Sequence, residues 1–255
     1  CQSDGLKIKG YLAYPNNLMG IHSFGNSQTL PCIIWNRGGS KDYGAIDSFS
    51  AKGIFGQLAS WGYVVFASQY RGSIKGQGKE SFGGDDINDV LNLKKIAEEI
   101  PFADTSLWGI EGWSRGGMMT YITFKKDHHF KCAVLVAALT DLIQNSFENK
   151  RLAKVYQELI GENNLEEELK KRSAINFIDE LPKSVNYLLI HGIKDLTISP
   201  TETLQMAKAM LERKFHFHLS LFEEGDHFLK KHKKEVDELR KYWYKKYLVK
   251  DKSES

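Results

Sequence analysis

Short apolar runs with the character of β-strands alternate along this chain with segments whose apolar residues recur at helical spacing. The strand candidates are residues 6–14, 31–35, 63–68, 106–111, 131–137, 187–192 and 215–222, and the first has the alternation of an edge strand. Helices are expected at about 48–62, 87–100, after Ser114, and at about 200–213 and 228–247. Buried strands joined by helices form a mostly parallel sheet covered on both faces, so the alternation predicts an α/β fold.

One segment interrupts this alternation. Residues 141–183 contain two or three charge-rich helical stretches and no strand candidate, which predicts a small helical cap over one end of the sheet. Ligands bind at the carboxyl ends of the strands in such sheets, and a cap there would shape a pocket. No internal repeat or linker divides the 255 residues, so we expect one domain over residues 1–249 and a disordered tail at 250–255.

Charge and apolar run length limit the partners of the chain. The 35 basic and 32 acidic residues give a net charge of +3, which is too small to indicate binding to nucleic acid or to an anionic membrane. No apolar run reaches the ~18 residues of a membrane span. We expect a cytoplasmic protein or an excised domain. A lipid anchor at Cys1 is the alternative, disfavoured because a strand candidate follows almost at once.

The cysteines do not indicate a disulfide framework. Cys32 and Cys132 both lie inside apolar runs that have the character of buried strands, where cysteine behaves as a small hydrophobic residue. We therefore expect buried thiols.

A serine flanked by glycines follows the strand candidate at 106–111. The segment Gly112-Trp113-Ser114-Arg115-Gly116 matches the pattern G-x-S-x-G, in which a strained turn between a strand and a helix exposes a nucleophilic serine. Glycines are needed there because the strand and the helix pass too close for side chains. The pattern alone occurs by chance, but its position favours a nucleophile over a serine that only caps the helix.

A serine hydroxyl needs a base that takes its proton and an acid that orients the base. His227, in the loop between the last strand and the last helix, is the candidate base. Asp195, just after the strand candidate at 187–192, is the candidate acid. Asp226 is a rival acid, but it is adjacent to His227 and such side chains diverge.

The negative charge that develops on a carbonyl oxygen needs donors fixed in advance. One should be the backbone N–H of Arg115, which follows the nucleophile. The other should come from the turn after residues 31–35, where Gly38 and Gly39 let the backbone approach a substrate.

Several segments in order resemble the catalytic domain of the prolyl oligopeptidase family of serine peptidases. They include "NRGG" at 36–39, "GGDDINDV" at 83–90, "GWSRGGMMT" at 112–120, "LLIHGIKDLTISP" at 188–200 and "EEGDHF" at 223–228. The resemblance implies an α/β-hydrolase fold with Ser114 as nucleophile, Asp195 as acid and His227 as base. It also implies a short peptide or ester as substrate.

The chain departs from this family at Arg37, where many members have a tyrosine or a histidine, and where a tyrosine hydroxyl serves as an oxyanion donor. Backbone groups of Gly38 or Gly39 are expected to replace that donor. Larger members also carry an amino-terminal β-propeller that filters substrates, for which this chain has no room. We expect the cap or a homo-oligomer to act as the filter. Pocket walls are expected from the following residues: Arg37, Trp113, Phe147, Tyr156 and Ile198.

The residues leave three functions open. The first is a serine peptidase that works through an acyl-enzyme and needs no metal and no cofactor. The second is a carboxylesterase that acts on small acyl esters. The third is a catalytically idle binding module, which the presence of all of Ser114, Asp195 and His227 disfavours.

Overall fold

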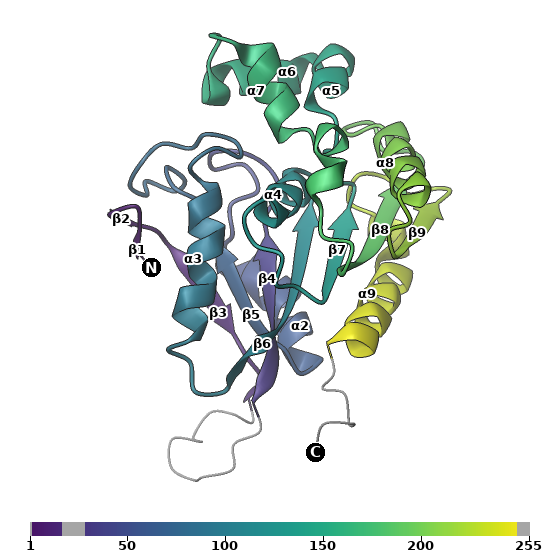
Figure 1. Ribbon diagram of the computed structural model, residues 1–255. Coiled ribbons are helices and arrows are strands. Elements are labelled where there is room, and N and C mark those ends of the chain that lie inside the picture. The colour runs from purple at the N-terminus through teal and green to yellow at the C-terminus, as the bar shows by residue number, and fades with distance from the viewer. Residues whose placement is uncertain (1, 17–28, 249–255) are drawn as a thin grey trace.

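A seven-stranded sheet forms the centre of the protein (Figure 1), and the computed structural model describes residues 2–16 and 29–248. The strand order is β3-β5-β4-β6-β7-β8-β9. The bounds are β3 Gly10–Ala13, β4 Leu30–Asn36, β5 Val64–Ser68, β6 Ala103–Trp113, β7 Cys132–Val136, β8 Asn186–Gly192 and β9 Phe217–Phe222. Only β3 runs antiparallel to its neighbour β5, so the prediction of a mostly parallel sheet is confirmed.

The amino-terminal strand differs from the prediction. Residues 6–14 do not form one edge strand. β2 (Leu6–Lys7) pairs with β1 (Gln2–Ser3) across a tight turn at Asp4 and Gly5, both with positive φ, and residues 8 and 9 separate it from β3. Only β3 joins the main sheet. The resulting hairpin packs against α3 (Ile87–Ala97), where Asp4 Oδ2 accepts a hydrogen bond of 2.9 Å from Asn88.

Helices cover both faces of the sheet because alternate residues of the strands point to opposite sides. In β4, Cys32 and Ile34 belong to the core under α3, α4 (Arg115–Phe124) and α8 (Pro200–Glu212). Ile33 and Trp35 belong to a second core under α2 (Gly56–Ser60) and α9 (Lys233–Tyr247). The shorter helical pieces are α1 (Ser48–Ser50), a π-helical turn (Ala51–Phe55) and a 3-10 turn before α9 (Lys230–His232).

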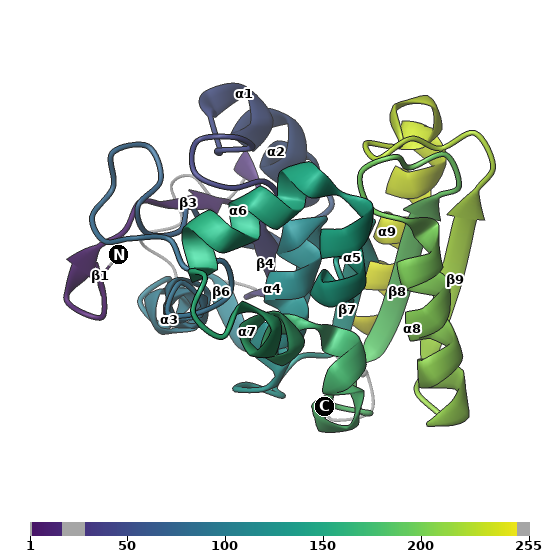
Figure 2. The same ribbon diagram turned by 90° about the horizontal axis from the view of Figure 1, so that it is seen from above.

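The predicted interruption of the fold is helical. Residues 142–180 form α5 (Leu142–Glu148), α6 (Lys150–Ile160), α7 (Leu165–Arg172) and two 3-10 turns (Ala174–Asn176 and Ile178–Glu180). These helices lie above α4 and the middle of the sheet, on the side toward which β7 and β8 point (Figures 1 and 2). They therefore cap the edge at which the parallel strands end.

The chain order places a crevice at this edge. From β4 the chain crosses first to β5 on one side of β4 and then to β6 on the other. The connections that leave the ends of β4 and β6 thus diverge, and such a switch point is where sheets of this type bind ligands. Gly38 and Gly39 follow β4, and Ser114 follows β6.

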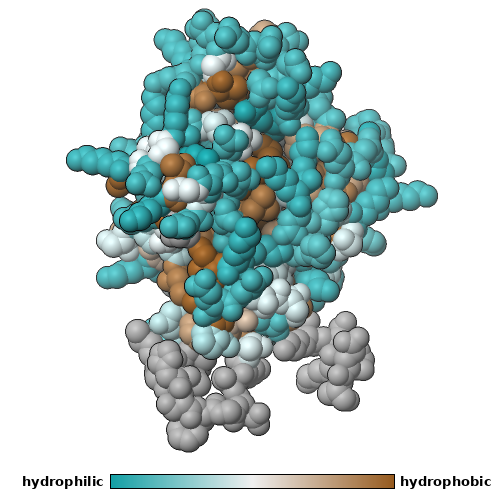
Figure 3. Space-filling view, turned by 60° about the vertical axis from the view of Figure 1, so that its left-hand side comes forward, coloured by the Kyte–Doolittle hydropathy of each residue, from teal (hydrophilic) through white to brown (hydrophobic). Residues whose placement is uncertain are grey.

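The surface and the cysteines agree with a well-packed interior. The face in Figure 3 is mainly hydrophilic, with small hydrophobic patches between polar side chains. Cys32 and Cys132 are buried and unbonded to each other, and burial raises the pKa of the Cys32 thiol to about 12. Within residues 2–16 and 29–248, none of the helices is both long and apolar enough to cross a lipid bilayer. The predictions about Cys1 and residues 250–255 lie outside the described residues.

Candidate active site

Ser114 stands on a strained turn between β6 and α4. Its φ of 55° and ψ of −121° lie in a region that residues with a side chain rarely adopt. The turn is held from both sides, because Ser114 N–H donates to Val136 O at 2.9 Å while Ser114 O accepts from Gly117 N–H at 2.9 Å. The predicted strand–serine–helix geometry is therefore present in this structure, with the serine side chain partly exposed.

The flanking glycines are required by close backbone approach. A Cβ at Gly112 would lie 2.1 Å from Gly116 O, and a Cβ at Gly116 would lie 2.0 Å from Asn36 O. Both distances are shorter than any real contact of a Cβ. The first turn of α4 thus packs directly on the ends of β4 and β6, and no residue with a side chain fits at either position.

His227 and Asp195 are joined by a hydrogen bond of 2.7 Å between His227 Nδ1 and Asp195 Oδ2. Asp195 follows β8 and His227 follows β9, so both come from the same sheet edge as Ser114. The hydrogen bonds of the described residues do not include one between His227 Nε2 and Ser114 Oγ. Such contacts are often long in enzymes without substrate and tighten when the substrate binds. Oδ1 of the rival Asp226 accepts instead from Lys230 N–H at 3.2 Å, while the imidazole bonds to Asp195.

Asp195 is held by four donors. Its Oδ1 accepts from the backbone N–H groups of Thr197 at 2.8 Å and Ile198 at 3.0 Å. Its Oδ2 is shared by His227 and by His191 Nε2, at 3.1 Å. Burial by itself would raise the pKa of Asp195, but the hydrogen bonds from His191 and His227 outweigh it and bring the pKa below its ordinary value. Asp195 is therefore a carboxylate at neutral pH.

His191 is a residue of this site whose role the sequence did not predict. It lies fully buried at the end of β8, with Nδ1 2.7 Å from Thr203 Oγ1 and Nε2 3.1 Å from Ile198 O. Because Nε2 faces two acceptors, Asp195 Oδ2 and Ile198 O, it carries the proton, and Nδ1 accepts from the Thr203 hydroxyl. The spacing from His191 to Asp195 was the available signal, but only the fold directs both side chains to one point.

The turn after β4 lies against the nucleophile. A Cβ at Gly38 would be 3.4 Å from Ser114 Cβ and 3.0 Å from Trp113 O. On the other side of Ser114, the N–H groups of Gly117 and Met118 bond to Ser114 O, which leaves the amides of Arg115 and Gly116 at the start of the helix. The two segments predicted to supply oxyanion donors are thus next to one another.

Three of the predicted pocket walls are corrected by the structure. Arg37, Tyr156 and Ile198 each have 0% of their surface exposed, so they belong to the interior and not to a wall that a substrate reaches. The polar groups of Arg37 and Tyr156 can be buried because other residues of the chain form hydrogen bonds with them. The Tyr156 hydroxyl donates to Asn145 Oδ1 at 2.8 Å, for example. Phe147, in contrast, is 81% exposed on the cap, and Trp113 is partly buried with Nε1 donating to Glu111 Oε1 at 2.9 Å.

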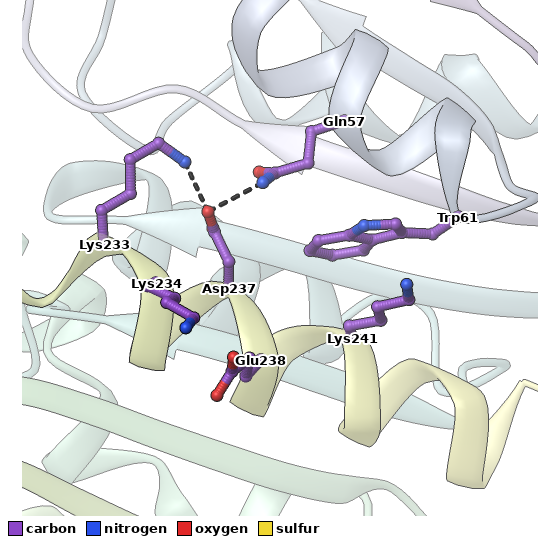
Figure 4. Close-up of a pocket in the computed structure, with 7 residues that line it drawn as sticks. All are labelled: Gln57, Trp61, Lys233, Lys234, Asp237, Glu238 and Lys241. Atoms are coloured by element: carbon purple, nitrogen blue, oxygen red, sulfur yellow. Dashed lines mark hydrogen bonds and ion pairs between the residues drawn. The ribbon is translucent and has the colours of Figure 1, made fainter.

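A separate shallow pocket lies between α2 and α9 (Figure 4). The carboxylate of Asp237 in this pocket accepts hydrogen bonds from Gln57 Nε2, at 2.7 Å, and from Lys233 Nζ. None of the seven residues that line it is a predicted site residue. This pocket is therefore distinct from the site around Ser114.

Comparison with known proteins identifies the family. Residues 49–251 match the prolyl oligopeptidase family. The chain is 30% identical over 200 residues to the uncharacterized peptidase YtmA of Bacillus subtilis, which covers 77% of this chain and 72% of that protein. It is 26% identical over 218 residues to human prolyl endopeptidase FAP, covering 81% of this chain and 28% of that protein.

Solved structures agree on the fold. All of this chain superposes on the acylaminoacyl peptidase of Pyrococcus horikoshii with a TM-score of 0.81 at 21% identity. An acylaminoacyl peptidase bound to Z-Gly-Gly-Phe-chloromethyl ketone gives 0.82 at 22% identity. The chain spans 42% of each of these proteins. With the match over 49–251 and the likeness to the Bacillus peptidase, the chain belongs to the prolyl oligopeptidase family of serine peptidases.

Proposed function

We propose that this protein is a serine hydrolase that cleaves short peptides through an acyl-enzyme, with Ser114, His227 and Asp195 as its catalytic residues. The observation that carries the proposal is the 2.7 Å bond from His227 Nδ1 to Asp195, at the sheet edge where Ser114 occupies its strained turn. That bond leaves His227 Nε2 as the nitrogen that can exchange a proton with the serine.

In the proposed reaction, His227 Nε2 takes the proton of Ser114 as the hydroxyl oxygen attacks the substrate carbonyl. The tetrahedral intermediate carries a negative oxygen, which accepts hydrogen bonds from the backbone N–H of Arg115 and from the turn at Gly38 and Gly39. His227 then gives its proton to the leaving amine. Water, activated by the same imidazole, hydrolyses the acyl-enzyme and restores Ser114. Asp195, kept ionised by its low pKa, stabilises the imidazolium that forms in each half of the reaction.

The substrate class follows from the family. The similar proteins are described as peptidases, among them an acylaminoacyl peptidase and a prolyl endopeptidase. This chain spans less than half of those two proteins, so their individual specificities do not transfer to it. We propose short peptides, cleaved at an amide, as the substrates, and the exposed Phe147 as one contact on the cap.

Active-site labelling combined with two kinds of substrate tests the proposal. The wild type should form one covalent adduct with a fluorophosphonate, at Ser114, and should hydrolyse aminoacyl amides. Ser114→Ala should form no adduct and should retain at most about 10⁻³ of the wild-type kcat, because only binding and oxyanion stabilisation remain.

Each alternative gives a different result. No adduct on the folded wild type would favour a binding module without catalysis. An adduct with much faster turnover of short acyl esters than of the matched amides would assign the protein as a carboxylesterase. Equal hydrolysis by the wild type and Ser114→Ala would exclude Ser114 as the nucleophile.

A further inference from the structure

Two arginine side chains lie buried directly beneath the turn that follows β4. Arg37 is 0% exposed and Arg115 is 1% exposed. Both guanidinium groups face the ring of Tyr70, at 5.2 Å for Arg37 and 4.9 Å for Arg115, measured from Cζ to the ring centroid. Buried arginines are uncommon unless they are paired. Their partners therefore indicate what they are for.

These partners include carbonyl groups of the turn itself. Arg115 NH1 donates to Gly39 O at 3.0 Å, and Arg37 NH1 donates to Gly38 O at 3.3 Å. The Tyr70 hydroxyl donates to Arg37 O at 3.3 Å. Three consecutive peptide groups, 37–38, 38–39 and 39–40, are thus held by three buried side chains.

Holding a carbonyl also sets the direction of the next amide. In a trans peptide the C=O and the N–H of one unit point in opposite directions. None of the peptide bonds between the described residues is cis. Because the carbonyls of residues 37–39 point toward the arginines and Tyr70, the N–H groups of Gly38, Gly39 and Ser40 point away from that cluster. Gly38 at the same time lies against Ser114 Cβ.

Charge balance explains why such a cluster is tolerated in the interior. Arg115 pairs with Asp86 at 2.7 Å and with Glu80, and both carboxylates are buried. Arg37 donates to neutral acceptors only: Gln69 O, Gly38 O, Tyr43 O, Lys41 O and Ser73 Oγ. Two guanidiniums and two carboxylates make the cluster neutral as a whole. Glu80 also accepts from Lys41 N–H at 2.7 Å, so the same carboxylate holds the far end of the turn.

We propose that Arg115, Arg37 and Tyr70 are positioning residues that orient the oxyanion donors of the turn at Gly38 and Gly39. Arg115 then has two functions: its backbone N–H is one donor, and its side chain aligns the other. The inference rests on the proposed function, because it concerns the oxyanion that Ser114 creates.

Conservative variants test this inference without leaving a cavity or an unpaired carboxylate in the cluster. Arg115→Lys keeps the positive charge between Glu80 and Asp86, but an ammonium lacks the planar fork that reaches both carboxylates and Gly39 O together. Tyr70→Phe keeps the ring and removes only the bond to Arg37 O. Arg240→Lys is the matched control. Arg240 is a 3% exposed arginine that pairs with Glu111 at 2.8 Å in the other core, under α9.

The measurements are kcat, KM and the affinity for a transition-state analogue, which together separate an effect on substrate binding from an effect on the transition state. Arg115→Lys should lower kcat by about 10-fold to 100-fold, since displaced donors cost somewhat less than the ~10²–10³ of a deleted one. Tyr70→Phe should lower kcat by about 5-fold, the worth of one hydrogen bond. In both variants KM should stay within about twofold, and the affinity for a peptide aldehyde, which forms a tetrahedral adduct, should fall in proportion to kcat. Arg240→Lys should destabilise the fold and leave kcat and aldehyde affinity within about twofold.

Two results would overturn the inference while the proposed function stands. The first is an unchanged kcat in both Arg115→Lys and Tyr70→Phe while Ser114→Ala is inactive. The proposed function would then stand, and only the positioning role would fail. The second is a fall in kcat that Arg240→Lys reproduces at equal loss of stability, which would reduce the cluster to a structural role. If the wild type forms no fluorophosphonate adduct, the proposed function fails and this inference fails with it.

Discussion

Both carboxylate oxygens of Asp195 accept hydrogen bonds, and each oxygen is held by a different pair of donors. The N–H groups of Thr197 and Ile198 fix Oδ1, while His191 and His227 meet at Oδ2. His191 is itself fixed by Thr203. The orientation of the proposed base is therefore set by a chain of buried contacts that begins in α8. We therefore propose that Asp195, and not Asp226 next to His227, controls the tautomer of the imidazole.

We predict that Asp195→Asn lowers kcat by about 10³-fold to 10⁴-fold, because the amide can donate to Nδ1 and so stabilise the wrong tautomer of His227. Asp226→Asn is the matched control, an aspartate-to-asparagine change in the same loop as His227, and should leave kcat within about twofold. Steady-state kinetics at pH 8 compare the two. A similar loss of kcat in both variants would contradict the assignment of Asp195 as the acid.

At the scale of elements, one buried carboxylate joins α8 to the start of the cap. Glu202 Oε2 accepts from the N–H groups of Thr140 at 2.8 Å and Asp141 at 3.0 Å, and Oε1 accepts from Asn145 at 3.1 Å. Burial, against the opposing effect of these hydrogen bonds, raises the pKa of Glu202 to about 7. A second contact between cap and site is the hydrogen bond of 3.1 Å from Asn149 Nδ2 to Thr197 O, in the loop that carries Asp195.

The raised pKa predicts a pH-dependent loss of stability. Between the ordinary pKa of 4.5 and the folded value of about 7, the unfolded chain has released the proton while the folded protein retains it. Stability from this group is therefore present at low pH and declines as the pH rises through that interval, by up to about 3 kcal/mol. Urea unfolding from pH 5 to pH 8 should show the wild type losing stability relative to Glu202→Gln, which cannot titrate. Parallel curves for the two proteins would contradict the assignment.

At the scale of the whole molecule, the cap shares its core with the sheet. The cluster that contains Cys32, Ile34 and Ile110 of the strands also contains cap residues such as Tyr156 and Leu159. The helices of the cap thus bury their apolar faces on the body of the protein. We therefore propose that the cap and the sheet form a single domain, with 141–183 as an insertion in it.

We predict one cooperative thermal transition for the chain, measured by calorimetry with equal calorimetric and van't Hoff enthalpies. Leu159→Ala, a cavity-forming change in the cap, should lower the midpoint of that single transition by about 5 °C or more. Leu204→Ala, at a 44% exposed position of α8, should change it much less. A separate low-temperature transition that alone responds to Leu159→Ala would show that the cap folds independently.

The sequence by itself determined the alternation of strands and helices after β3 and the elbow at Ser114, because these depend on local periodicity and on a short motif. It also named His227 and Asp195 as candidates, although the hydrogen bond between them forms only because the fold brings together two loops that follow different strands. It failed where the outcome depends on what a distant segment supplies. Arg37 was predicted to face the substrate, yet carbonyls of its own turn and of residue 69 draw it inward. Glu80 and Thr203 carried no local signal, and Asp86 lay in the segment "GGDDINDV" of the family resemblance without a role assigned to it. Their roles were decided only when the packed sheet brought buried charges and unpaired backbone groups together, since burial makes each such group require a partner.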